Sequence, residues 1–233
     1  MNPGSRFTAV MAAGILSIGS AVSGQETTPR LRDIAKRLEL TAAGSGRWLD
    51  ALGVTGSPKP AERLIALTST GRVIATRDGD ESSVSLGLEL DLQLLTPGSA
   101  LVLVHNHPGN AGLSANDLGH LAKPGVAAVV AVARDGSIYM AARGRRYDAI
   151  AFELRQYDPL RVELRKRLRV ECGARALTTE TADAHFSHVA ALALVKASVI
   201  AYEAVLVGDS RQSFDLARVT LVRAAQSAAA RVK

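Results

Sequence analysis

The alternation of apolar and polar positions changes along the chain and separates a strand-rich middle from helical ends. Between Thr28 and Leu52, leucine and isoleucine recur at near-helical spacing with charged residues between them, which predicts a helix. Gly53–Pro60 is rich in Gly, Pro and Ser, as linkers are. The sequence therefore predicts a helical lead-in and linker over residues 25–60.

The spacing of the apolar residues becomes shorter after residue 60. Arg63–Ser69 and Arg72–Thr76 are apolar runs on either side of Thr70-Gly71, and this arrangement predicts a β-hairpin. Leu86–Leu95 alternates apolar residues with acidic or polar ones, so a strand and a short helix both remain open for it.

The rest of the middle region continues this pattern around one sheet. We predict a buried strand at Ala100–His105, a helix at Ser114–Ala122 that Pro124-Gly125 ends, and a second hairpin of Val126–Ala133 and Ser137–Ala142 around Asp135-Gly136.

Helical periodicity returns after residue 148. Ala149–Arg169 is predicted to be an amphipathic helix interrupted near Pro159, and Ser213–Val232 an Ala-rich helix. Ala182–Val207 is predicted to be a long apolar helix, with His185 and His188 on its surface. It is expected to face the core or a partner rather than a membrane, because two charged residues interrupt it.

The N-terminal segment Met1–Gly24 has the pattern of an export signal. Arg6 gives a positive start, Phe7–Val22 is apolar, and Ala21-Val22-Ser23 fits a cleavage site. The alternative is an ordinary N-terminal helix. The segment thus favours export, with a cytoplasmic protein as the other reading, and no membrane domain is expected beyond this signal or anchor.

These patterns predict an α/β fold with four parts: the signal or helix at 1–24, the lead-in and linker at 25–60, a sheet domain at 61–148 and a helical C-terminal region at 149–233.

Composition adds little to this picture. Hydrophobic residues make up 47% and charged residues 21%, which is ordinary for a globular protein. The net charge of +6 permits an acidic partner such as nucleic acid but does not require one. Arg161–Arg169 could contact nucleic acid or form the solvated face of a helix, while aromatics, at 4%, are too few for base-stacking clusters. Cys172 is the single cysteine, which excludes an intramolecular disulfide.

The candidate chemistry lies at the end of the buried strand. Side chains two residues apart on a strand share a face, so His105 and His107 direct both imidazoles the same way. Asp117 lies in the first turn of the following helix and can supply a third ligand. Three protein ligands leave one tetrahedral position open for water, as a catalytic zinc site requires. Taken singly, Ser114 and Asp117 also fit an ordinary helix start.

The run His105-Asn106-His107-Pro108 followed by Ser114-x-x-Asp117 resembles the JAMM (MPN+, JAB-type) zinc metalloprotease motif. Its Asn-containing form is similar to the bacterial RadC-like and toxin-associated branches, and the resemblance covers about residues 61–142. The spacer Gly109–Leu113 is one residue shorter than in the commonest eukaryotic form. The resemblance implies a JAMM/MPN-like sheet flanked by helices.

The resemblance also implies a zinc-dependent hydrolase of peptide or isopeptide bonds. His105, His107 and Asp117 would hold Zn²⁺, and Ser114 would stabilise the oxyanion. The family takes its general base from a Glu on an earlier strand, and Glu62 matches that position better than Glu81 or Glu89.

Two other functions stay open at this stage. One is a non-enzymatic interaction module on the same fold, against which the intact ligand set argues. The other is a RadC-like nucleic-acid-associated protein, suggested by the motif and the positive charge. The protein or peptide substrate is not identified by the sequence.

Overall fold

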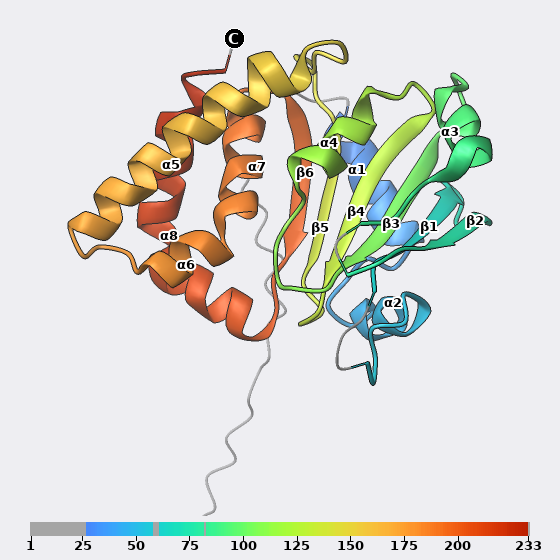
Figure 1. Cartoon of the computed structure of the whole chain (residues 1–233), viewed down its shortest axis with the longest axis horizontal. Coiled ribbons are helices and arrows are strands. Elements are labelled where there is room, and N and C mark those ends of the chain that lie inside the picture. The colour runs from blue at the N-terminus through green and yellow to red at the C-terminus, as the bar shows by residue number, and fades with distance from the viewer. Residues whose placement is uncertain (1–26, 58–60, 82, 233) are drawn as a thin grey trace, which may run out of the picture.

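A six-stranded mixed sheet forms the centre of the molecule (Figure 1). The computed structural model describes residues 27–57, 61–81 and 83–232, so the predicted signal at 1–24 lies outside the described residues. The strand order is β2-β1-β3-β4-β5-β6. Only the neighbours β3 and β4 run parallel, and the other pairs are antiparallel. The strands are β1 Arg63–Thr68, β2 Val73–Asp78, β3 Leu101–His107, β4 Val126–Ala133, β5 Ile138–Arg143 and β6 Ile200–Val205.

The central strand β3 is buried on both faces. Its side chains alternate between two cores: Leu101 and Leu103 pack into one, and Val102 and Val104 into the other. A strand covered on both sides needs an unbroken aliphatic run, which the segment Leu-Val-Leu-Val supplies. The side chains of β3 that follow Leu103 on its face therefore lie on the same side of the sheet.

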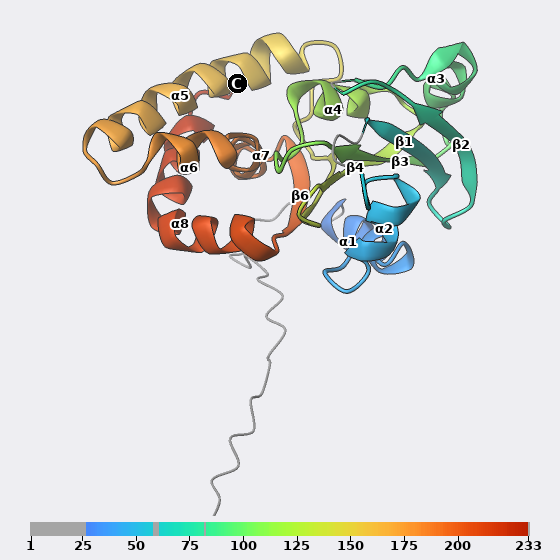
Figure 2. The ribbon, with the colours of Figure 1, turned by 60° about the horizontal axis from the view of Figure 1, so that its bottom comes forward.

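Helices cover both faces of this sheet. The first core contains residues of α3 (Gly87–Leu95), α4 (Ala115–Gly119) and the C-terminal helices, and the second contains residues of α1 (Thr27–Arg37) and α2 (Ser45–Ala51). Figure 2 shows α1 and α2 on one side of the sheet, α3 and α4 on the other, and α5–α8 gathered beyond β6. The predicted α/β class with a flanked sheet and a C-terminal helical extension is confirmed.

The predicted single helix over Thr28–Leu52 is instead two helices. Glu39 adopts a positive φ of 52°, which an α-helix does not contain. Gly44, just before α2, lies so close to this turn that an added Cβ would be 2.1 Å from the Glu39 carbonyl oxygen. The backbone turns back at these residues, so the apolar side chains of both helices reach one core.

The predicted long helix over Ala182–Val207 is wrong in its second half. The segment contains the end of α6 (Thr179–Ala184), then α7 (Phe186–Lys196) and the strand β6. Ser198 has a positive φ of 61° and ends the helical path, and β6 then pairs with the edge of β5. The β-branched and aromatic residues of β6 favour a strand, because their side chains pack well on the pleated surface of a sheet.

The other elements follow the expected order. The ambiguous segment at Leu86–Leu95 is the helix α3, and a 3₁₀ turn, His120–Ala122, continues α4. The predicted interruption near Pro159 is a change of helix type: a π-helical turn ends at Tyr157, and Pro159 lies in the first turn of α5 (Asp158–Gly173), where its missing N–H costs nothing. The π-helical turn spans Phe152–Tyr157, and α8 spans Gly208–Ala229.

Within the described residues 27–57, 61–81 and 83–232, none of the helices combines the length and apolar character that a bilayer crossing requires.

Candidate metal site at the end of the central strand

The two predicted histidines lie together at the end of β3. The strand extends two residues beyond its predicted end, so both rings belong to it. His105 is 5% exposed, and its Nε2 lies 2.9 Å from Nε2 of His107. The same-face prediction is therefore confirmed.

The carboxylate of Asp117 faces both rings. Its Oδ1 lies 3.1 Å from His105 Nε2, and its Oδ2 lies 3.3 Å from His107 Nε2. Among the described residues, these three side chains form a group that could hold a metal ion, with all ligand atoms within 4.8 Å of one another.

A capping box fixes Asp117 at this position. The Ser114 Oγ accepts a hydrogen bond from the Asp117 N–H at 3.2 Å, and the Asp117 Oδ2 accepts one from the Ser114 N–H at 2.6 Å. The helix-start reading of these two residues is thus correct as well. The same local structure that begins α4 also directs the carboxylate toward the histidines.

A backbone carbonyl orients the ring of His107. Its Nδ1 lies 3.0 Å from the Ala111 carbonyl oxygen, within the Gly109–Leu113 spacer. A carbonyl oxygen only accepts hydrogen bonds, so Nδ1 carries the proton and Nε2 of the neutral ring keeps its lone pair. Such an outer hydrogen bond is typical of histidines that bind metals.

The electrostatics of the group favour positive charge at its centre. Burial disfavours the Asp117 carboxylate, but the two histidines outweigh this effect and hold its pKa well below the ordinary value. Burial likewise opposes protonation of His107, yet Asp117 and the Ala111 carbonyl raise its pKa above the ordinary value. A metal cation bound between the two imidazoles and the Asp117 carboxylate would interact favourably with the negative charge of that carboxylate.

The donor atoms are also close enough for one small ion to contact all three residues. The two imidazole nitrogens lie 2.9 Å apart, and each lies 3.1 or 3.3 Å from one of the two Asp117 oxygens. Two imidazoles and one carboxylate are also a donor set that zinc accepts. The residues present therefore fit the metal that the sequence suggested.

Glu62 lies beside this group, just before β1. Leu64 pairs with His105 in antiparallel register, and Glu62, two residues before Leu64, lies close enough for the charges of both histidines to act on it. Burial raises the pKa of the Glu62 carboxyl, opposed by His105 and His107 and reinforced by Asp117.

The competing carboxylates have a different setting. Glu81 and Glu89 are both exposed, with Glu89 in the first turn of α3. The charges of His105, His107 and Asp117 act on the Glu62 carboxyl.

The spacer between the histidines and Ser114 packs against the C-terminal helices. A Cβ on Gly112 would lie 3.3 Å from both the backbone nitrogen of His188 and a ring carbon of Tyr139, so the loop contacts both residues closely. His188 is buried, not on a helix surface as predicted, and its Nδ1 lies 2.7 Å from the Tyr202 hydroxyl. Burial lowers the pKa of His188 to about 3.

The contact between His188 and Tyr202 could not be predicted from the sequence pattern, because it depends on the strand β6. Tyr202 was assigned to a helix, whereas it lies on the strand that brings its hydroxyl to His188. His185 is also buried, with its Nε2 2.8 Å from the Ser213 hydroxyl.

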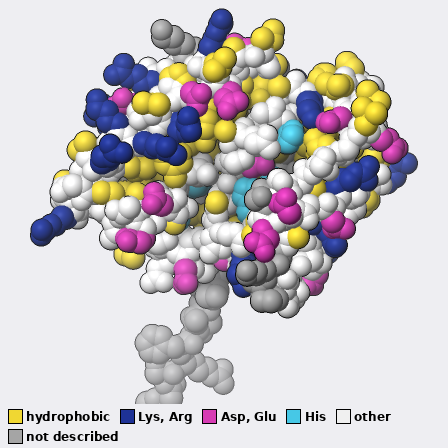
Figure 3. Space-filling view, viewed as in Figure 1, with side chains coloured by type: hydrophobic (Ala, Val, Ile, Leu, Met, Phe, Trp, Pro, Cys, Tyr) yellow, Lys and Arg dark blue, Asp and Glu magenta, His cyan; other side chains and the backbone are white. Residues whose placement is uncertain are grey.

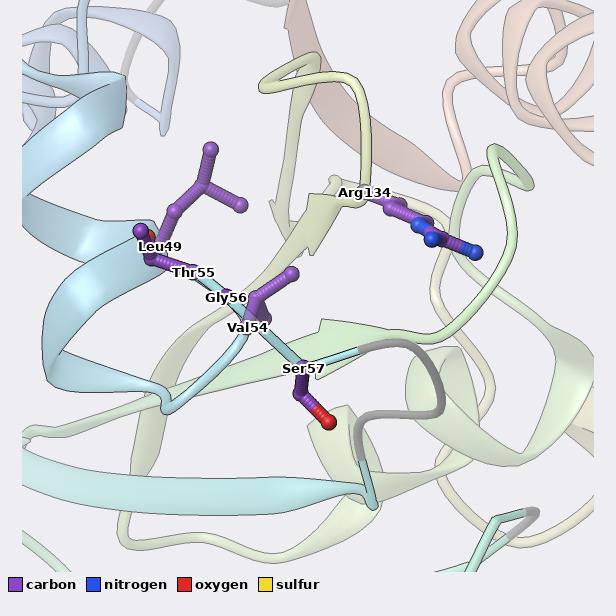
Figure 4. A pocket seen from close by; sticks show the side chains of 6 residues that line it. All are labelled: Leu49, Val54, Thr55, Gly56, Ser57 and Arg134. Carbon is purple, nitrogen blue, oxygen red and sulfur yellow. The ribbon is translucent and has the colours of Figure 1, made fainter.

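Figure 3 shows histidine side chains close to acidic ones near the centre of the face in that view. A separate cavity of about 400 Å³ lies beside the α2–β1 connection. Figure 4 shows residues 54–57 and Leu49 along that cavity and Arg134, from the β4–β5 turn, opposite them. It contains none of the candidate site residues.

Comparison with known proteins adds no identification. No protein-family model matches the chain, and neither the curated proteins nor the solved structures contain a significant match.

Proposed function

We propose that this protein is a zinc-dependent hydrolase of peptide or isopeptide bonds, of the JAMM type. The observation that carries the proposal is the convergence of the buried His105 imidazole, the half-buried His107 imidazole and the buried Asp117 carboxylate, with Glu62 beside them. His105, His107 and Asp117 would hold the zinc ion. When bound, the ion supplies a Lewis acid that lowers the pKa of a water molecule toward about 7.

In this mechanism Glu62 moves the proton. Its carboxylate takes a proton from the attacking water and returns it to the leaving amine. Burial supports this role because it raises the pKa of Glu62 toward the working range of a general base. The two histidines oppose this rise in the pKa of Glu62 and favour the charged carboxylate.

Ser114 stabilises the developing oxyanion. Its Oγ uses a lone pair to accept the Asp117 N–H, so its own proton remains available for donation. The capping box holds this hydroxyl next to the ligand Asp117. One helix start therefore supplies both a ligand and an oxyanion donor.

Metal content tests the first half of the proposal. The purified wild-type protein should carry about one zinc per chain after incubation with zinc and gel filtration, and His107→Ala should carry far less. Mass spectrometry of the metal measures this directly. A wild-type chain that takes up no zinc would contradict the proposal.

Hydrolysis tests the second half. Wild type should cleave members of a quenched fluorogenic peptide library or a set of isopeptide-linked peptides, and Glu62→Gln should lose about 10²- to 10⁴-fold in kcat while keeping its zinc. The matched control is Glu81→Gln, which removes an exposed carboxylate nearby in the sequence. Full activity in Glu62→Gln would exclude Glu62 as the base.

A further inference from the structure

Asn106, between the two histidines, is fully buried and bonded to the segment that contains Glu62. Its exposed fraction is 0%. Its Oδ1 accepts a hydrogen bond from the Arg63 N–H at 2.6 Å, and its Nδ2 donates one to the Ala61 carbonyl at 2.9 Å. Because one partner can only donate and the other can only accept, the orientation of the amide is fixed.

These two hydrogen bonds take the place of backbone pairing between β3 and the residues just before Leu64. The ladder between β1 and β3 is registered from the Leu64–His105 pair onward, and the residues before Leu64 have no partner in that ladder. The Asn106 side chain bonds the backbone on both sides of Glu62 instead.

The other edge of the same segment is held by the end of the β1–β2 hairpin. The Glu62 N–H donates to the Asp80 carbonyl at 2.6 Å, and the Glu62 carbonyl accepts from the Gly79 N–H at 2.7 Å. Four hydrogen bonds thus hold the backbone of residues 61–63 on its two edges, and two of them come from the Asn106 side chain. Removal of the Asn106 amide would remove the two that join this backbone to the end of β3.

We propose that Asn106 is the positioning residue for Glu62: its amide ties the Glu62 backbone to the strand that carries both histidines. This inference rests on the proposed function and specifies how the base and the ligand set keep a fixed separation. Since His105 and His107 flank Asn106, one short stretch of β3 sets the positions of two ligands and of the base. Asn106 itself touches no reacting atom and acts through Glu62.

The size of the effect follows from the tolerance of catalytic geometry. A displacement of about 1 Å in a catalytic group can cost about 100-fold in rate. We therefore expect Asn106→Leu, which is close in shape but has no amide, to lower kcat by about 10- to 100-fold with little change in KM. Asn106→Asp keeps the acceptor for Arg63 and loses the donor to Ala61, so its loss should be smaller.

The decisive experiment is a double-mutant cycle with Glu62→Gln. If Asn106 acts through Glu62, Asn106→Leu should lower the residual rate of Glu62→Gln by less than about twofold. A loss in that background as large as in wild type would overturn the proposal. Unchanged kcat in Asn106→Leu would overturn it as well.

A second readout does not depend on hydrolysis. Amide hydrogen exchange at Arg63 should accelerate at least about tenfold in Asn106→Leu, because this N–H loses its acceptor, while the bound zinc stays at the wild-type level. The control is Val104→Ala, which creates a cavity two residues earlier on the same strand but keeps the Asn106 amide, and it should leave Arg63 exchange unchanged relative to its neighbours.

The two readouts separate the proposals. If wild type cleaves none of the substrates, the proposed function fails, and Arg63 exchange alone decides whether Asn106 holds the segment. Unchanged exchange would overturn the positioning role. If Asn106→Leu does not fold, Asn106→Ala, which also removes both side-chain hydrogen bonds, carries the same cycle and the same exchange measurement at Arg63.

Discussion

Ser114 serves two purposes whose energies can be separated by substitution. Its Oγ caps α4 by accepting the Asp117 N–H, and in the proposed mechanism its proton stabilises the oxyanion. Replacement of an N-cap Ser by Ala costs about 1 kcal/mol of stability, and replacement by Gly only a few tenths of a kcal/mol. Loss of one oxyanion donor costs about 10²- to 10³-fold in kcat. Stability and rate should therefore respond differently to the two changes.

We predict that Ser114→Ala and Ser114→Gly lose the same factor in kcat but differ in stability. Urea unfolding should show a clear loss for Ser114→Ala and almost none for Ser114→Gly. Steady-state kinetics should show about a 100- to 1,000-fold loss for both. Ser114→Thr keeps a hydroxyl at the cap and should stay close to wild type in both measurements.

Zinc content provides the control, since Asp117 retains its bond to the Ser114 backbone N–H in all three variants. Each should bind zinc at the wild-type ratio. A near-wild-type rate in Ser114→Gly would refute the oxyanion role and leave only the cap. A rate loss that follows lost zinc would show that the hydroxyl acts through the position of Asp117.

Two further predictions concern pH. Asp117 raises the pKa of His107, and zinc binds only the neutral ring, so zinc affinity should fall as the pH drops through that raised pKa. A chelator competition series between about pH 5 and 8 measures this, and a constant zinc affinity would contradict the prediction. The pKa of His188 in the folded protein is lowered to about 3, from an ordinary value of 6.5. Between these two values the unfolded chain binds a proton on His188 that the folded protein does not bind. The free energy of unfolding therefore decreases as the pH falls, by about 1.4 kcal/mol per pH unit from this residue. Urea unfolding of metal-free wild type and His188→Gln should show a flatter pH dependence in the variant, and equal slopes would contradict the assignment.

Local patterns were sufficient for much of the candidate site. A period of two on a buried strand places His105 and His107 on one face whatever the rest of the fold does. The Ser114-x-x-Asp117 spacing produces a capping box by itself, because both hydrogen bonds join residues of a single helical turn. These parts of the prediction depend on neighbours in sequence, and the structure confirms them.

The rest depends on pairing between distant segments. Glu62 reaches the ligand set only because β1 lies antiparallel to β3 in the register that joins Leu64 to His105. Periodicity does not specify register between strands separated by a helix, so the sequence could rank the three glutamates but could not locate them.

The failure at β6 has the same cause. Val199–Val207 is apolar enough for either a buried helix or a strand, and its own pattern does not decide between them. The open edge of β5 decides, since it supplies the backbone partners that make a strand favourable there. The sequence by itself determined the histidine pair, the capping box and the order of most elements. Only the tertiary structure determined which glutamate faces the histidines, that Asn106 holds its backbone, and that β6 brings Tyr202 to the histidine beneath the spacer loop.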